Sequence, residues 1–138
     1  MKLPAIKFSK WVKWPERKSI KNSDYPGVYL LAKFKRIPAG RVNPLNKSIV
    51  YIGETCNNTL KGRWYQFHCS AHYNKEGHSG GFTYYKKYRG NVDDLFVAAL
   101  PVVNIKDNLR HLLIRYIERK LILEYAIKHR KQPECNKK

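Results

Sequence analysis

Apolar and polar residues follow two different periods along this chain, and the periods predict an order of elements. Two short runs rich in β-branched and aromatic residues, 28–34 and 48–53, predict β-strands that pair antiparallel. Between them, residues 36–47 contain several prolines, glycines and asparagines, which is typical of a long hairpin loop. A third apolar run, 94–103, has the length of a buried strand.

Helical spacing appears in two other segments. In residues 59–73, large apolar side chains recur every three or four positions, at Leu60, Trp64, Phe67 and Ala71. The longest predicted helix runs from residue 107 to about residue 130. Residues 75–81 read as a loop, whereas the aromatic and basic run 82–89 fits either an edge strand or a segment that stacks bases and holds phosphates. The order strand, strand, helix, strand, helix predicts an α+β fold, with an antiparallel sheet of about three strands flanked by helices.

Composition narrows the class of partner. The 138 residues predict one domain and include 28 Lys and Arg against 10 Asp and Glu, a net charge of +18. Such a charge favours a polyanion, with nucleic acid ahead of an acidic membrane surface. No apolar run reaches 18 residues and the first residues lack a signal-peptide core, so we expect no membrane span. The three widely spaced cysteines predict free thiols in a reducing cytoplasm.

The long C-terminal helix carries one carboxylate that needs an explanation. With residues 109–127 wound at about 100° per residue, Glu124 projects within the apolar stripe, while Glu118 projects away from it and is expected to be solvated. A carboxylate on a core-facing stripe is costly unless it is paired, hydrogen-bonded or bound to a metal. Glu124 is therefore either a metal ligand or the partner of Lys120, Lys128 or an arginine in the core.

Several short motifs occur in a fixed order. Gly27-Val28-Tyr29 and Tyr51-Ile52-Gly53 each lie in a predicted strand, Arg63 lies near the start of the next helix, and Glu124 precedes Pro133 and Asn136. This ordered set resembles the GIY-YIG nuclease family over residues 27–136. The long loop between the two motifs is similar to that of restriction-type or phage members.

The resemblance implies a function and a role for each residue. It implies a metal-dependent endonuclease domain, residues 27–138, that cuts DNA to 5′-phosphate and 3′-hydroxyl ends with Mg²⁺ or Mn²⁺. Tyr29 would orient or deprotonate the attacking water, Tyr51 would contact water or phosphate, and Arg63 would stabilise charge on the phosphate. Glu124 would bind the metal, with Glu118 as the alternative, and Asn136 would complete the catalytic set.

Other residues remain alternatives for parts of this site. Lys61 rivals Arg63 as the cationic group, and His68 or His72 could assist proton transfer. Their spacing with Cys69 and His78 argues against zinc. Glu54 reads as a plain exposed acid.

Contacts to DNA are expected in the basic aromatic arm 1–26, the hairpin loop, residues 75–91 or a second subunit of a homo-oligomer. The candidate DNA-binding side chains are Lys33, Arg41, Lys86, Lys87 and Arg89. The alternative function is a basic nucleic-acid-binding module on the same fold that has lost catalysis.

Overall fold

The predicted α+β fold is confirmed by a computed structural model, which describes residues 3–136. The sheet has four antiparallel strands in the order β1-β4-β2-β3. The elements, in chain order, are β1 (Val12–Lys13), the 3₁₀ helix η1 (Trp14–Ser19), β2 (Gly27–Lys33), β3 (Ile49–Thr55), α1 (Leu60–Tyr73), α2 (Ser79–Tyr88), β4 (Leu95–Pro101) and α3 (Asp107–His129).

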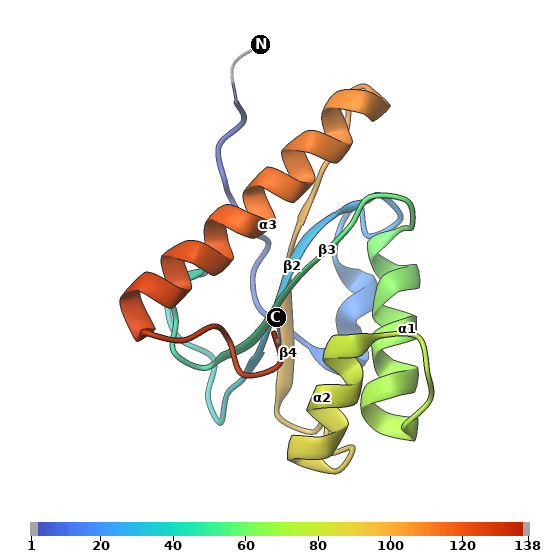
Figure 1. The fold of residues 1–138 in the computed structure, drawn as a ribbon, viewed down its shortest axis with the longest axis vertical. Coiled ribbons are helices and arrows are strands. Elements are labelled where there is room, and N and C mark those ends of the chain that lie inside the picture. Colours follow the sequence, from blue (N-terminus) through green and yellow to red (C-terminus); the bar gives the residue numbers. More distant parts are fainter. Residues whose placement is uncertain (1–2, 137–138) are drawn as a thin grey trace.

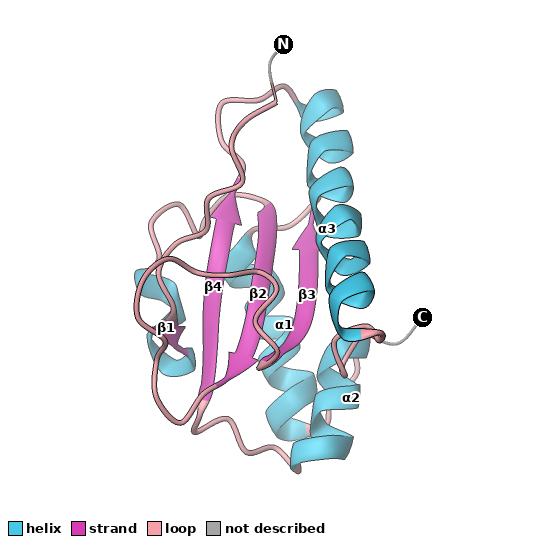
Figure 2. Cartoon of the chain, turned by 90° about the vertical axis from the view of Figure 1, so that its left-hand side faces the viewer, coloured by secondary structure: helices cyan, strands magenta, loops and turns pink. Residues whose placement is uncertain are grey.

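The sheet separates two helical layers (Figure 1). Helix α3 covers one face, and α1, α2 and η1 cover the other, so the apolar core is divided in two. Figure 2 shows β2 and β4 in the middle of the sheet and β3 at its edge next to α3. Because β2 pairs on both sides and is covered on both faces, it is an almost continuous apolar run rather than an alternating one.

Gly27 begins β2 because a neighbouring backbone passes very close to it. A Cβ atom at this position would lie 2.3 Å from the carbonyl oxygen of Leu100 in β4. The glycine of the first tyrosine motif thus permits the pairing of β2 with β4, and its reason is packing within the sheet.

Two segments differ from the sequence prediction. Residues 75–81 were predicted as a loop and residues 82–89 as an edge strand or a base-stacking segment, but residues 79–88 form helix α2, because tertiary packing overrides the poor helix propensity of Gly80 and Gly81. The N-terminal segment is built into the sheet, since β1 pairs with β4. Trp11 packs with the α3-side core and Trp14 with the α1-side core.

Helix α3 is turned relative to the predicted stripe. Its buried side chains are Leu113, Ile114, Ile117, Leu121 and Tyr125. Winding the sequence at 100° per residue predicts Leu109 and Ile127 within the apolar stripe and Leu112 and Leu123 at its edge, but all four are exposed, Ile127 by 71%. Apolar residues occur around most of this helix, so periodicity alone did not identify the side that meets the sheet. None of the helices within residues 3–136 is both long and apolar enough to cross a membrane.

Candidate functional site

The two motif tyrosines lie side by side on the α1 face of the sheet. Tyr29 in β2 pairs with Gly53 in β3, and the ring centroids of Tyr29 and Tyr51 are 6.0 Å apart. A Cβ at Gly53 would lie 2.4 Å from the Tyr51 ring and 2.6 Å from Cζ of Tyr29. Gly53 therefore makes room for both phenols. Gly80, at the start of α2, similarly leaves room for the opposite edge of the Tyr51 ring.

Tyr29 is hydrogen-bonded to a histidine that sequence analysis did not single out for catalysis. Nε2 of His78 lies 2.9 Å from the Tyr29 hydroxyl, and Nδ1 accepts a bond of 3.1 Å from the backbone N–H of Gly81. Burial, with help from the nearby Arg63 charge, lowers the pKa of His78 to about 3. The imidazole is thus neutral, its proton lies on Nε2, and it donates to the Tyr29 oxygen.

Neither phenol ionises readily. Burial raises the pKa of Tyr29 well above its usual value, with a further rise from Tyr51, and Tyr29 has no exposed surface. Burial likewise raises the pKa of Tyr51 to about 12, although Arg63 opposes the rise. Tyr51 is half-buried and remains accessible to solvent. The structure therefore argues against Tyr29 as the group that deprotonates a solvent water, and it leaves Tyr51 as the phenol that a ligand can reach.

Arg63 lies near both tyrosines, and the competing Lys61 is exposed on α1. The Arg63 guanidinium donates to Oε1 of Gln66 at 2.7 Å and to the carbonyl of Gly77 at 3.2 Å. Its charge partly opposes the rise that burial causes in the pKa values of Tyr29 and Tyr51, and it adds to the lowering of the His78 pKa. Only part of its fork of donors is used internally, so it can still bind an anion.

Glu118 and Glu54 are the carboxylates whose charges act on the two tyrosines, although Glu118 belongs to the helix that covers the opposite face of the sheet. Burial raises the pKa of Glu118 from about 4.5 to about 7, the neighbouring Glu54 raises it further, and Arg119 partly offsets both effects. The two carboxylates also raise the pKa values of Tyr29 and Tyr51. Oε2 of Glu54 accepts a bond from the Cys56 thiol at 2.9 Å. Glu54 is half-buried, so it is not the plain exposed acid that the sequence suggested.

Glu124 does not join these groups. Its carboxylate forms an ion pair with Lys120 one turn earlier, at 2.8 Å, and 43% of its side chain is exposed. The prediction that Glu124 projects into the core is wrong, and so is the prediction that Glu118 is solvated, because α3 is rotated away from the assumed orientation. The ion-pair interpretation of Glu124 is the one that the structure supports.

Asn136 braces the edge of the sheet. Its Oδ1 accepts from the backbone N–H of Ile52 and its Nδ2 donates to the carbonyl of Ile52, both at 2.8 Å. The N–H of Cys135 also donates to the carbonyl of Val50. The tail thereby satisfies backbone groups on the free edge of β3, next to Tyr51 and Gly53. This contact gives Asn136 a positioning role.

His68 and His72 are held away from the tyrosines. Nδ1 of His68 accepts from Nε1 of Trp14 at 2.9 Å, and burial lowers the pKa of His68 to about 4. Nδ1 of His72 lies 2.7 Å from the carbonyl of Gly90. Both rings are thus committed to packing η1 and the α2–β4 turn against α1.

The predicted DNA-binding side chains fall into two groups. Arg41, Lys86, Lys87 and Arg89 are exposed. Lys33 is instead engaged within the protein, because its ammonium lies 2.6 Å from Asp94 and 4.2 Å from the centre of the Tyr88 ring. Lys33 is the least available of the set.

No three His, Cys, Asp or Glu side chains in the described part of the chain gather closely enough to hold a metal ion by themselves. Comparison with protein-family models, with curated proteins and with solved structures finds no match for this chain.

Proposed function

We propose that this protein is a metal-dependent DNA endonuclease that hydrolyses phosphodiester bonds to 5′-phosphate and 3′-hydroxyl ends. The observation that carries the proposal is that the charges of Arg63, Glu54 and Glu118 all act on the two adjacent phenols, Tyr29 and Tyr51. An acidic pair beside a cationic group and hydroxyl donors supplies what phosphate hydrolysis requires, namely a cation site and charge stabilisation at the phosphate. The order of motifs, which resembles the GIY-YIG nucleases, supports the same assignment.

The carboxylate pair fits a divalent cation. Glu118 is held at a pKa of about 7 by burial and by a second carboxylate, an arrangement that a bound cation would relieve. Mg²⁺ in phosphate-processing sites is commonly held by one or two carboxylates, with water and substrate oxygens completing the shell. Glu118 is thus the metal-binding residue that we propose, with Glu54 beside it. When bound, Mg²⁺ or Mn²⁺ supplies Lewis-acid stabilisation of phosphate oxygens.

The remaining residues position the substrate. Arg63 supplies a planar fork of donors to a non-bridging phosphate oxygen. Tyr51, the accessible phenol, donates a hydrogen bond to water or phosphate. Tyr29 stays protonated, and its hydroxyl oxygen accepts a hydrogen bond from Nε2–H of His78. Its ring packs against that of Tyr51 and holds it in place. Asn136 fixes the backbone at Ile52, between Tyr51 and Gly53.

A nucleic-acid-binding module without catalysis is the second candidate. The complete burial of Tyr29 favours it, because the fold provides no solvent-exposed first tyrosine to act on water. The net charge of +18 serves either function equally.

Cleavage of supercoiled plasmid DNA in Mg²⁺, in Mn²⁺ and in EDTA separates the two. We expect nicked or linear product with either metal and none in EDTA, and ligatable ends that carry a 5′-phosphate. Tight DNA binding without cleavage in either metal would support the second candidate instead.

A further inference from the structure

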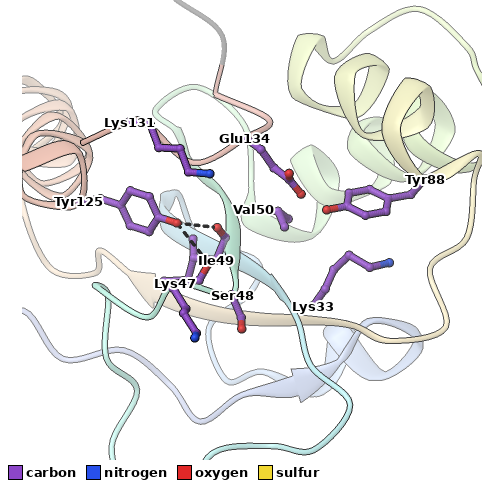
Figure 3. Close-up of a pocket in the computed structure, with 9 residues that line it drawn as sticks. All are labelled: Lys33, Lys47, Ser48, Ile49, Val50, Tyr88, Tyr125, Lys131 and Glu134. Atoms are coloured by element: carbon purple, nitrogen blue, oxygen red, sulfur yellow. Dashed lines mark hydrogen bonds between the residues drawn. The ribbon is translucent and has the colours of Figure 1, made fainter. Parts of the chain in front are cut away.

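A basic hollow opens at the start of β3, on the strand edge that also carries the candidate site (Figure 3). Its volume is about 240 Å³. Lysines from three separate segments line it: Lys33 at the end of β2, Lys47 in the loop before β3, and Lys131 after α3. The fold thus gathers three cations that lie far apart in the sequence.

The free cations of the hollow are Lys47 and Lys131. Lys33 is neutralised by Asp94 at 2.6 Å, whereas neither Lys47 nor Lys131 is in an ion pair among residues 3–136, and both are exposed. The Ser48 side chain also lines the hollow. One carboxylate opposes them, that of Glu134 on the rim, which Figure 3 shows facing the Tyr88 hydroxyl. Two unpaired ammonium groups and hydroxyl donors suit an anion of one charge.

The hollow does not suit a nucleobase. Two tyrosines line it, and both are engaged within the protein. The Tyr88 ring has the Lys33 ammonium 4.2 Å from its centre and the Tyr84 ring at 4.7 Å, and the Tyr125 hydroxyl donates to the carbonyls of Lys47 and Ile49. These contacts compete with a base for the aromatic side chains, so the chemistry of the hollow favours a phosphate group over a base.

We propose that this hollow binds a backbone phosphate of duplex DNA, as a positioning contact beside the candidate catalytic site. This inference rests on the proposed function for its partner. Val50 lines the hollow and Gly53 lies at the tyrosine pair, a separation of about 10 Å at ~3.3 Å per strand residue.

The test measures binding of a fluorescent 20-base-pair duplex in EDTA, where no cleavage occurs, as a function of salt. The double variant Lys47→Gln/Lys131→Gln should reduce the log–log salt slope by about 0.9, the value for one phosphate contact. The matched control, Lys106→Gln/Arg115→Gln, removes the same charge from exposed positions just before α3 and in its N-terminal half, away from the hollow, and should leave the slope almost unchanged.

A reciprocal change strengthens the test. Glu134→Gln removes the opposing charge and should tighten duplex binding several-fold, whereas Asp107→Asn, at the exposed start of α3, should have a much smaller effect. Equal effects of the hollow variants and their controls would overturn the proposal, since they would show only the overall charge of the protein. Because the assay needs neither metal nor cleavage, a selective slope change in a protein that fails to cut DNA would refute the nuclease assignment and leave the phosphate site standing.

Discussion

The imidazole of His78 and the phenol of Tyr29 form a buried pair in which the histidine is the donor, across 2.9 Å. The Gly81 N–H fixes the direction by occupying Nδ1. A helix cap in α2 thereby determines the hydrogen bonding of a strand tyrosine 49 positions earlier in the chain. The pair supports Tyr51, whose ring lies against both side chains, at 6.0 Å from Tyr29 and 5.3 Å from His78.

Loss of the His78–Tyr29 hydrogen bond should destabilise the fold. His78→Ala leaves the Tyr29 hydroxyl without its donor and opens a cavity, and we expect a loss of about 2–4 kcal/mol in unfolding free energy. His78→Gln keeps a donor near Nε2 and should recover much of the stability. Urea unfolding measures the stability of each variant. If the two variants are equally stable, the bond to Tyr29 contributes nothing.

The neutral state of His78 predicts acid sensitivity. Its pKa is about 3 in the fold, below the ordinary value of 6.5, so its contribution to stability is complete above pH 6.5 and is lost as pH falls toward 3. The stability difference between wild type and His78→Gln should therefore shrink on acidification. His68, with a pKa of about 4, titrates in the same range but is unchanged in both proteins, so it cancels in this comparison. A difference independent of pH would contradict a buried neutral imidazole.

Glu118 predicts the opposite pH dependence. Its pKa is raised to about 7, so the fold favours the protonated form, and its contribution to stability is lost as pH rises through 7. Relative to Glu118→Gln, which cannot ionise, the wild type should lose stability between pH 5 and pH 8 when no metal is present. Mg²⁺ must displace this proton, so Mg²⁺ affinity should rise over the same interval. Thermal unfolding with and without Mg²⁺ checks both statements.

Arg63→Ala should lower the single-turnover cleavage rate at least about 100-fold, the scale for one preorganised donor at a transition state. Lys61→Ala removes the same charge from the exposed side of α1 and should lower the rate much less. Comparable losses in both variants would show that the arginine acts only through general charge.

Asn136→Ala removes two hydrogen bonds to Ile52 and should destabilise the fold by about 1–3 kcal/mol, because strand-edge groups lose their partners. Asn136→Asp keeps the acceptor for the Ile52 N–H but loses the donor, and its stability should fall between those of the other two proteins. Amide hydrogen exchange at Ile52 should quicken in Asn136→Ala. Unchanged exchange there would refute the bracing role.

Strands and long helices were predictable, whereas the composition of the site was not. The strands β2, β3 and β4 were predicted from the apolar runs 28–34, 48–53 and 94–103, because buried strands require apolar side chains. Helix α1 was predicted from the spacing of Leu60, Trp64 and Phe67. Helix α2 was not predicted, because Gly80 and Gly81 have low helix propensity. Both glycines instead permit close packing, Gly80 against the Tyr51 ring and Gly81 against α1.

The errors at the site have one physical origin: side chains that converge in space carry no local signal. Which of Glu118 and Glu124 faces the sheet depends on how α3 is rotated about its own axis. Only packing against the sheet determines this rotation, which buries Ile114 and Tyr125 and leaves Ile127 exposed. The contact of His78 with Tyr29 spans 49 positions.

The central claim is that Glu118, and not Glu124, holds the metal at an endonuclease site, and one paired measurement tests it most directly. Plasmid cleavage in Mg²⁺ is compared for wild type, Glu118→Gln and Glu124→Gln, after duplex binding in EDTA has shown that all three bind DNA equally. We expect Glu118→Gln to abolish cleavage and Glu124→Gln, which loses only a surface ion pair with Lys120, to cut at close to the wild-type rate. Full activity in Glu118→Gln with loss in Glu124→Gln would contradict the account.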